Sequence, residues 1–222
     1  MRTLSSDRLL NRPVVAGIAL AGMTAGVLVG RGGLDTVVGC GITGDDRPSL
    51  TAKDWVDNAD HVVVASPTAE RDTNRRDFDK GSVQYQTDRA VSFRTDDVLW
   101  SSERPRRSMG ESFEMVAAGW RVYRDSGTRV KRTTAAAPRL EPGHTYLLAL
   151  RWDEGRWTVL GEGAAVPFDD GTAGRGEWCG RVLGEEDFAR GERFSRRDDS
   201  SLEETVLGQN AQAVTRELKR AG

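Results

Sequence analysis

Cysteine and histidine are scarce in this chain of 222 residues, which has two of each: Cys40, Cys179, His61 and His144. Zinc fingers and iron–sulfur sites take several such side chains at short, fixed spacings. The scarcity therefore argues against both kinds of metal centre. Asp169-Asp170-Gly171 superficially suggests a calcium loop, but the spacing of carboxylates that such a loop needs is not met, so a turn is the better interpretation. We expect no metal and no cofactor.

An excess of charge of either sign is also lacking. Lys and Arg number 32 and Asp and Glu number 34, which gives a formal net charge of −2 and a pI near 5.8. A dedicated nucleic-acid binder needs a surplus of basic residues for its phosphate contacts, so we expect no nucleic-acid partner. The metalloprotease pattern H-E-x-x-H, the Walker A loop and the G-x-S-x-G elbow are absent as well, and we find no other active-site pattern that indicates an enzyme.

Charge is missing altogether from residues 13–30, the 18-residue run PVVAGIALAGMTAGVLVG. A helix of that length spans about 27 Å, close to the hydrocarbon thickness of a bilayer. Arg2, Arg8 and Arg12 precede the run, which favours a cytoplasmic N-terminus over residues 1–12. We predict an uncleaved transmembrane signal anchor at 13–30, with the bulk of the chain extracytoplasmic.

Lipoprotein processing is the alternative for this N-terminus. Val37-Val38-Gly39-Cys40 resembles a lipobox, in which the cysteine becomes acylated and N-terminal, although Arg31 and Asp35 interrupt the approach to it. With either kind of N-terminus, we expect the chain to belong to a cell envelope. Only four of the 32 basic residues are lysines, a bias that is common in GC-rich genomes and favours an actinobacterial source.

The exported part divides by composition. Residues 31–50 are rich in Gly, Asp and Pro and are typical of a linker. Thr51 and Asp54 form a capping box that predicts a short helix. Strands are then predicted by alternating or β-branched residues, with Arg-rich loops at 67–80, 101–112 and 124–139 between them. The predicted strands are 61–65, 82–87, 90–100, 113–123, 144–152, 156–161 and 164–168.

Three local features refine this division. Asp96-Asp97 and Gly119 interrupt their strands and predict bulges, and Asp153-Glu154-Gly155 predicts a tight hairpin. The resulting β-barrel domain covers 51–168. An irregular segment is expected at 169–200, followed by a helical tail at 201–222 in which Ser201 starts one helix and Gly208 separates it from a second.

The arrangement resembles the OB-fold module of tissue inhibitors of metalloproteinases and netrins, with its plainer bacterial relatives. The resemblance rests on three pieces in order: Ala59-Asp60-His61-Val62-Val63-Val64, the alternating strand at 91–100, and Leu140-Glu141-Pro142-Gly143-His144-Thr145-Tyr146-Leu147-Leu148. It covers about half of the chain. It implies a mainly β fold: an OB-like antiparallel barrel with a short N-terminal helix and, here, a C-terminal helical tail and one transmembrane helix.

The protease inhibitors of that family place the amine of an N-terminal cysteine, in a Cys-x-Cys start, on the target's zinc. This chain has Cys40-Gly41-Ile42, with no second cysteine, and Cys40 becomes N-terminal only if cleavage follows Gly39. Inhibition of an extracellular protease is therefore kept as an alternative function.

The two cysteines are most simply explained by a disulfide between Cys40 and Cys179, because an exported chain lies in an oxidising compartment. Closing so long a loop contributes on the order of 4–5 kcal/mol in the chain-entropy account. Acylation of Cys40 and a nucleophilic Cys179 are the alternatives. In the latter case Cys179 and His144 would act as in sortases, which are anchored cysteine transpeptidases built on a β-barrel. Cys179 lies in a glycine-rich stretch, however, and lacks the strand that precedes the sortase cysteine.

Two tryptophans, Trp157 and Trp178, are candidate contacts for a partner, because an exposed indole stacks on sugars or anchors a protein. Packing in the core or at its rim is the simpler interpretation of both side chains. Trp152 is expected in the core, on one face with Tyr146 and Leu148. Both histidines stand at strand starts, where we expect them partly exposed. The predicted function is a non-catalytic binding or scaffolding module of the cell envelope, whose partner is an envelope protein or a cell-wall polymer.

Overall fold

The structure is a computed structural model, and it describes residues 37–38, 47–133, 137–179, 181–183, 186 and 201–222. The predicted anchor at 13–30 and the cysteine Cys40 lie outside these residues. Among the described residues, no helix has both the length and the apolar character needed to cross a membrane. The fold is mainly β, as predicted, with a short helix before the main strands and two helices at the C-terminal end.

The capping box that the sequence predicts at the start of the first helix is confirmed. In α1 (Ala52–Asn58) the Thr51 hydroxyl accepts from the Asp54 N–H at 3.0 Å, and the Asp54 carboxylate accepts from the Thr51 N–H at 2.9 Å. These bonds satisfy two backbone donors that the first turn of a helix leaves free. The buried Trp55 is fixed in addition by its indole N–H, which donates to the Ser49 carbonyl at 2.7 Å.

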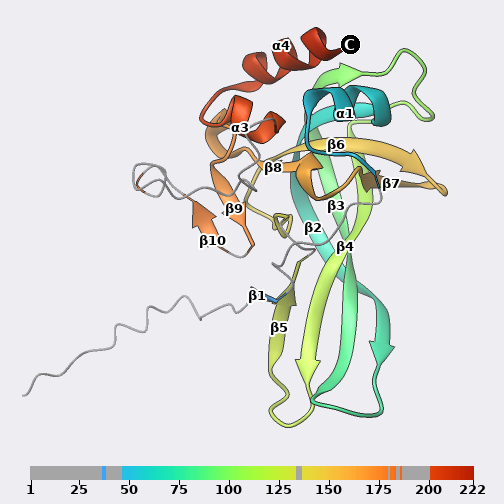
Figure 1. Cartoon of the computed structure of the whole chain (residues 1–222). Coiled ribbons are helices and arrows are strands. Elements are labelled where there is room, and N and C mark those ends of the chain that lie inside the picture. The colour runs from blue at the N-terminus through green and yellow to red at the C-terminus, as the bar shows by residue number, and fades with distance from the viewer. Residues whose placement is uncertain (1–36, 39–46, 134–136, 180, 184–185, 187–200) are drawn as a thin grey trace, which may run out of the picture. The chain divides into compact units, whose positions relative to one another are not determined.

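One sheet holds eight of the strands (Figure 1). Its path runs β1-β5-β4-β3-β2-β6-β7, and β8 adds to β6. A further parallel bridge joins β4 to β7 at Met115 and Trp157, so the pairings β2-β3-β4-β7-β6-β2 return to their starting strand. The strands are β1 (Val37–Val38), β2 (His61–Asp77), β3 (Val83–Ser101), β4 (Ser112–Tyr123), β5 (Arg129–Arg132), β6 (Tyr146–Asp153), β7 (Arg156–Val159) and β8 (Ala165–Pro167).

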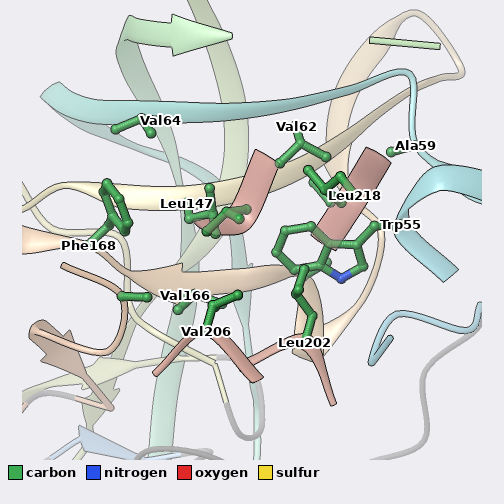
Figure 2. Close-up of a cluster of buried hydrophobic side chains, with 14 of the residues drawn as sticks. Trp55, Ala59, Val62, Val64, Leu147, Val166, Phe168, Leu202, Val206 and Leu218 are labelled. Carbon is green, nitrogen blue, oxygen red and sulfur yellow. The ribbon is translucent and has the colours of Figure 1, made fainter. Parts of the chain in front are cut away.

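Buried apolar side chains form two clusters on the two faces of the central strands. Alternation in β6 divides them, since Leu147 and Ala149 belong to one cluster while Leu148 and Leu150 belong to the other. The first cluster is covered by helices: Figure 2 shows Trp55 of α1 together with Leu202 of α3 (Leu202–Val206) and Leu218 of α4 (Ala211–Ala221). The predicted helical tail is therefore part of the core.

The start and the division of that tail are as predicted. The Ser201 hydroxyl accepts from the Glu204 N–H at 3.1 Å and caps α3. Gly208 separates α3 from α4 with a φ of 72°, a backbone conformation that glycine adopts without steric cost. The Asn210 side chain then caps α4 by accepting from the Ala213 N–H.

The predicted loop at 67–80 is wrong over most of its length, because β2 continues to Asp77 and pairs with β3 throughout. The predicted strands 82–87 and 90–100 are likewise one strand. Residues 68–77 are exposed at nearly every position, so this part of β2 buries neither of its faces. We call residues 68–77 of β2, 83–88 of β3 and 118–123 of β4 the arm. Figure 1 shows these three strands continuing together beyond β6 and β7.

The bulges are confirmed. Asp96 is skipped in the pairing between β2 and β3, where Asp97 faces Val64 and Thr95 faces Ala65. Gly119 is skipped between β3 and β4, where Trp120 faces Thr87 and Ala118 faces Asp88. The extra residue bends the bulged strand and increases its twist.

Gly119 is required at its bulge because the two strands come too close for a side chain. A Cβ at this position would lie 2.5 Å from the Thr87 carbonyl oxygen and 2.8 Å from that of Asp88. We expect Gly119→Ala to lower the free energy of unfolding by about 1–3 kcal/mol in urea titrations. Gly110→Ala is the matched control, since its Cβ comes no nearer than 3.4 Å to other atoms. Equal effects of the two substitutions would contradict this account of the bulge.

The hairpin at Asp153-Glu154-Gly155 is also confirmed, with Glu154 and Gly155 both at positive φ as a two-residue turn demands. The segment 169–200 is more ordered than predicted. Within its described part, the short helix η2 (Asp169–Gly171) comes first, and β9 (Gly176–Trp178) then pairs with β10 (Arg181–Leu183). The other short helix, η1 (Glu162–Ala164), precedes β8.

Candidate functional site

His144 is held by a carboxylate that the sequence did not indicate. Its Nδ1 lies 2.6 Å from Asp169 Oδ2, and the Thr145 N–H donates to Asp169 Oδ1 at 2.7 Å. Both side chains are about one-fifth exposed, at 20% and 24%. Gly176 backs the carboxylate: a Cβ there would lie 2.8 Å from Asp169 Oδ2. Asp169 thereby orients the imidazole, which is the relation of a base to its orienting group in nucleophilic catalysis.

Cys179, the other fallback catalytic residue, lies in the turn after β9 with a φ of 53°. It follows Gly176 by three residues and is half-buried. No free cysteine is found in the part of the chain that the structure describes. Its partner in the predicted disulfide, Cys40, lies outside the described residues, so the pairing of Cys40 with Cys179 stays a prediction.

Thiol labelling tests that pairing. We expect both cysteines of the full chain to resist a maleimide until a reductant is added, and the intact mass to be that of the uncleaved chain with the disulfide closed. Ready labelling of Cys179 without reductant would contradict the disulfide. Cys179→Ser is the control, because it frees Cys40 and should give one label without reduction.

Trp157 has the core packing that is the alternative to a partner contact. Its side chain is only 5% exposed and lies in the second apolar cluster, edge-on to Trp152 with ring centroids 5.1 Å apart. Burial follows from its place in β7, which pairs with β6 on one side and with β4 on the other. Trp157 is thus a core residue and is not a partner contact. Trp178 is half-buried and packs against the first cluster.

Of the two neighbouring tryptophans Trp152 and Trp157, Trp152 is the more accessible. It is half-buried, and the Arg107 guanidinium lies 4.5 Å from its ring centroid. A cation over an indole face is a favourable electrostatic contact. Arg107 also ties the loop after β3 to the start of β2, because its carbonyl oxygen lies 2.8 Å from His61 Nε2. His61 is 4% exposed, and its Nδ1 lies 2.8 Å from the Ser101 hydroxyl, so the expected exposure of this histidine is wrong.

Asp60, which the sequence singles out only as part of a longer pattern, joins three segments. Its carboxylate is 2% exposed and accepts from the N–H groups of Arg106 at 2.9 Å and Trp152 at 2.7 Å, besides an ion pair with the Arg106 guanidinium. Burial raises the pKa of Asp60, but these hydrogen bonds and the charge of Arg106 together outweigh burial and hold the pKa below its ordinary value of 3.8.

The burial of two arginines was also not predictable from the sequence. Arg89 and Arg139 are both 1% exposed at the side chain, and both donate to the Ala118 carbonyl beside the Gly119 bulge. Arg89 forms an ion pair with Glu70, and Arg139 forms one with Glu141. Burial and the neighbouring charge of Arg89 lower the pKa of Arg139 to about 10.

A buried tyrosine and glutamate complete this region. The Tyr146 hydroxyl donates to Glu177 Oε2 at 3.0 Å and accepts from the Glu141 N–H, and the same Glu177 oxygen accepts from the Arg139 N–H at 2.8 Å. Burial and the charge of Glu177 raise the pKa of Tyr146 above its usual range. These bonds fasten β9 to the segment before β6.

No group of three or more metal-ligating side chains occurs among the described residues. No family model matches the chain, and no curated protein matches it. The structure therefore offers two candidate sites from the chain's own geometry: the His144–Asp169 pair and the buried arginines next to the arm.

Proposed function

We propose that the chain is a non-catalytic binding or scaffolding module of the cell envelope, anchored in the membrane by residues 13–30 and exposed outside the cytoplasm. The observation that carries the proposal is the arm. Over residues 68–77 the strand has no buried face, so this part of the sheet adds little to the core while it presents a long, regular surface to solvent.

The arm is held in shape by charged contacts between strands. Arg71 forms a bidentate ion pair with Glu114 of β4, with N–O distances of 2.8 and 3.0 Å, and Arg129 forms an ion pair with Asp72. Arg75 stacks on Tyr85, its guanidinium 3.8 Å from the ring centroid. Exposed pairs of this kind contribute little stability singly, about 0.2–1 kcal/mol. Because these pairs make the surface of the arm polar, the arm suits a polar partner such as an envelope protein or a cell-wall polymer.

We also propose that the closed set of pairings β2-β3-β4-β7-β6 is an OB-like barrel related to the module of tissue inhibitors of metalloproteinases and netrins. The OB fold is a five-stranded, partly open barrel. Five strands take part in the circuit here, and its closure depends on the single described bridge between Met115 and Trp157. The remaining neighbours in the circuit are antiparallel.

Photo-cross-linking in cells tests the proposed binding surface. A photo-activatable residue at Gln84, which is exposed on the arm, should give a covalent adduct of discrete mass with an envelope component. The matched control is the same residue at Gln212, which is exposed on α4. An adduct from both positions alike, or from neither, would contradict a partner surface on the arm.

A cysteine transpeptidase is the second candidate, favoured by the orientation of His144 by Asp169 at 2.6 Å. It requires a free thiol at Cys179, whereas no free cysteine is found among the described residues, so the structure does not support this candidate, and the labelling experiment above tests it directly. Protease inhibition, the third candidate, requires a mature chain that begins at Cys40, and the intact mass in that experiment distinguishes it.

A further inference from the structure

One face of the arm and of the neighbouring β5 carries arginines from three strands. Arg76 of β2 pairs with Gln86 of β3, and Gln86 pairs in turn with Arg121 of β4, so these three side chains share one face of the sheet. Arg132 reaches the same face from β5, because Arg121 pairs with Val130 and side chains two residues apart in a strand point to one side. We call Arg76, Arg121 and Arg132 the arginine patch.

The charges of the arginine patch are only partly neutralised by its neighbours. Asp88 forms an ion pair with Arg132 at 3.6 Å. Arg121 bonds to the neutral Gln86, whose amide oxygen accepts from Arg121 Nε at 3.0 Å in the orientation that satisfies both side chains. Neither Arg76 nor Arg121 forms an ion pair with any of the residues that the structure describes. In these contacts three positive charges therefore face a single carboxylate.

The arginines of the patch also lie close enough to affect one another. Burial lowers the pKa of Arg132 below its ordinary value of 12.5, and the like charges of Arg121 and Arg76 lower it further, although Asp88 opposes them. Arg76 is exposed, and the side chain of Arg132 is 25% exposed, so the patch is open to a partner in solution or on a surface. The whole chain has a net charge of −2, so a local surplus of positive charge favours an anionic partner here.

The place of β1 relates the arginine patch to the predicted anchor. Figure 1 shows β1 beside β5, and the two pair in parallel, with Val38 opposite Arg132. The N-terminal end of β1 therefore points along β5 toward Arg129 and the hairpin at the free end of the arm. The predicted anchor ends at residue 30, seven residues before Val37, and seven residues span at most about 25 Å. The chain thus keeps this side of the arm near the surface of the membrane that would hold the anchor.

We propose that Arg76, Arg121 and Arg132 bind the headgroups of anionic phospholipids, so that this face of the arm lies against the membrane. A guanidinium matches the geometry of a phosphate group with two parallel N–H groups. A lipid surface presents many phosphates, so each arginine can bind a headgroup of its own. The proposal rests on the proposed anchor at 13–30, and it adds a second contact with the same membrane.

Photo-cross-linking of the full chain in lipid nanodiscs tests this contact. A photo-activatable residue replaces Val116, which is 45% exposed and lies on the face of the patch, since Ala118, two residues further along β4, pairs with Asp88. In discs of phosphatidylcholine and phosphatidylglycerol in equal amounts, we expect adducts with the mass of phosphatidylglycerol to exceed those with phosphatidylcholine. Their yield should fall about fivefold or more in the double variant Arg76→Gln, Arg121→Gln, because each arginine near an anionic surface adds to the attraction.

The matched control is the double variant Arg216→Gln, Arg220→Gln on α4. It removes the same amount of positive charge from two exposed positions, and it should leave the yield of phosphatidylglycerol adducts at Val116 unchanged. The substitutions of Arg76 and Arg121 break no ion pair among the described residues, so we expect that variant to keep its fold.

Three results would overturn the proposal. Equal yields with the two lipids would show that the contact does not depend on charge, and equal yields in the wild-type chain and the Arg76, Arg121 variant would show that it does not depend on the patch. A chain that co-purifies with the discs but gives no lipid adduct at Val116 would overturn the lipid contact alone. A chain that does not co-purify with the discs would overturn the anchor and this contact together.

Discussion

Leu218→Ala is expected to lower the free energy of unfolding by about 2–5 kcal/mol, the usual cost of emptying a buried leucine site. Leu218 is fully buried although it lies only four residues from the end of the chain, and it packs in one cluster with Trp55 of α1. The loss should appear in urea unfolding as a lower midpoint with an unchanged slope, because the whole core unfolds as a unit.

Lys219→Ala is the matched control, at an exposed position on the same turn of α4. Its effect should stay within about 0.5 kcal/mol, as is usual for surface substitutions. Should Leu218→Ala prove as mild as Lys219→Ala, the tail would be an appendage to the sheet, and the first apolar cluster would be stable without it.

Asp60→Ala should have an effect of similar size. The substitution leaves the buried N–H groups of Arg106 and Trp152 without an acceptor, and each loss costs about 1–3 kcal/mol. Asp57→Ala is the matched control, since Asp57 is half exposed and forms a surface pair with Lys53. Urea unfolding at neutral pH measures both, and comparable losses would contradict the role assigned to Asp60.

The contribution of Asp60 should also depend on pH. Because the folded state holds the pKa of Asp60 below 3.8, its stabilising contribution is fully present above that value and is lost as the pH falls through the lower, folded pKa. The difference in stability between the wild-type chain and Asp60→Asn should therefore shrink in acid. A difference that stays constant from pH 7 down to pH 3 and below would contradict the depressed pKa.

Features that depend on a few neighbouring residues were predictable from the sequence. The capping box at Thr51, the hairpin turn at Glu154-Gly155 and the bulge at Gly119 each follow from backbone geometry that only certain residues satisfy. The mainly β character and the two helices of the tail follow from periodicity over short segments in the same way.

The arm was not predictable by the same means, because its β2 residues carry no apolar alternation. They form a strand because their backbone pairs with β3 as far as Asp77. The ion pairs of Arg71 with Glu114 and of Asp72 with Arg129 add to this pairing, at separations of 43 and 57 residues. The paired charges were visible in the sequence as an Arg-rich stretch with acidic neighbours, but their partners depend on a register that the sequence alone does not show.

The burial of Trp157 and the candidate sites were not predictable from the sequence for a related reason. Trp157 is buried through the contact of β7 with β4, which joins residues 42 positions apart (Met115 with Trp157), and no local pattern indicates that contact. Arg89 and Arg139 resemble many other arginines of the chain, and only the bulge at Gly119 singles out the carbonyls they bind. His144 is a candidate site residue from the sequence, but the sequence around its partner Asp169 indicates only a turn.

Protease accessibility in intact cells tests whether the chain is anchored in the membrane and exposed outside the cytoplasm, with an epitope tag placed after Gly222. We expect the tagged chain to fractionate with the membrane, and protease added outside intact cells, stripped of their wall, to remove the tag. Protection of the tag until the membrane is dissolved, or recovery of the intact chain in the soluble cytoplasmic fraction, would contradict an anchored module exposed outside the cytoplasm.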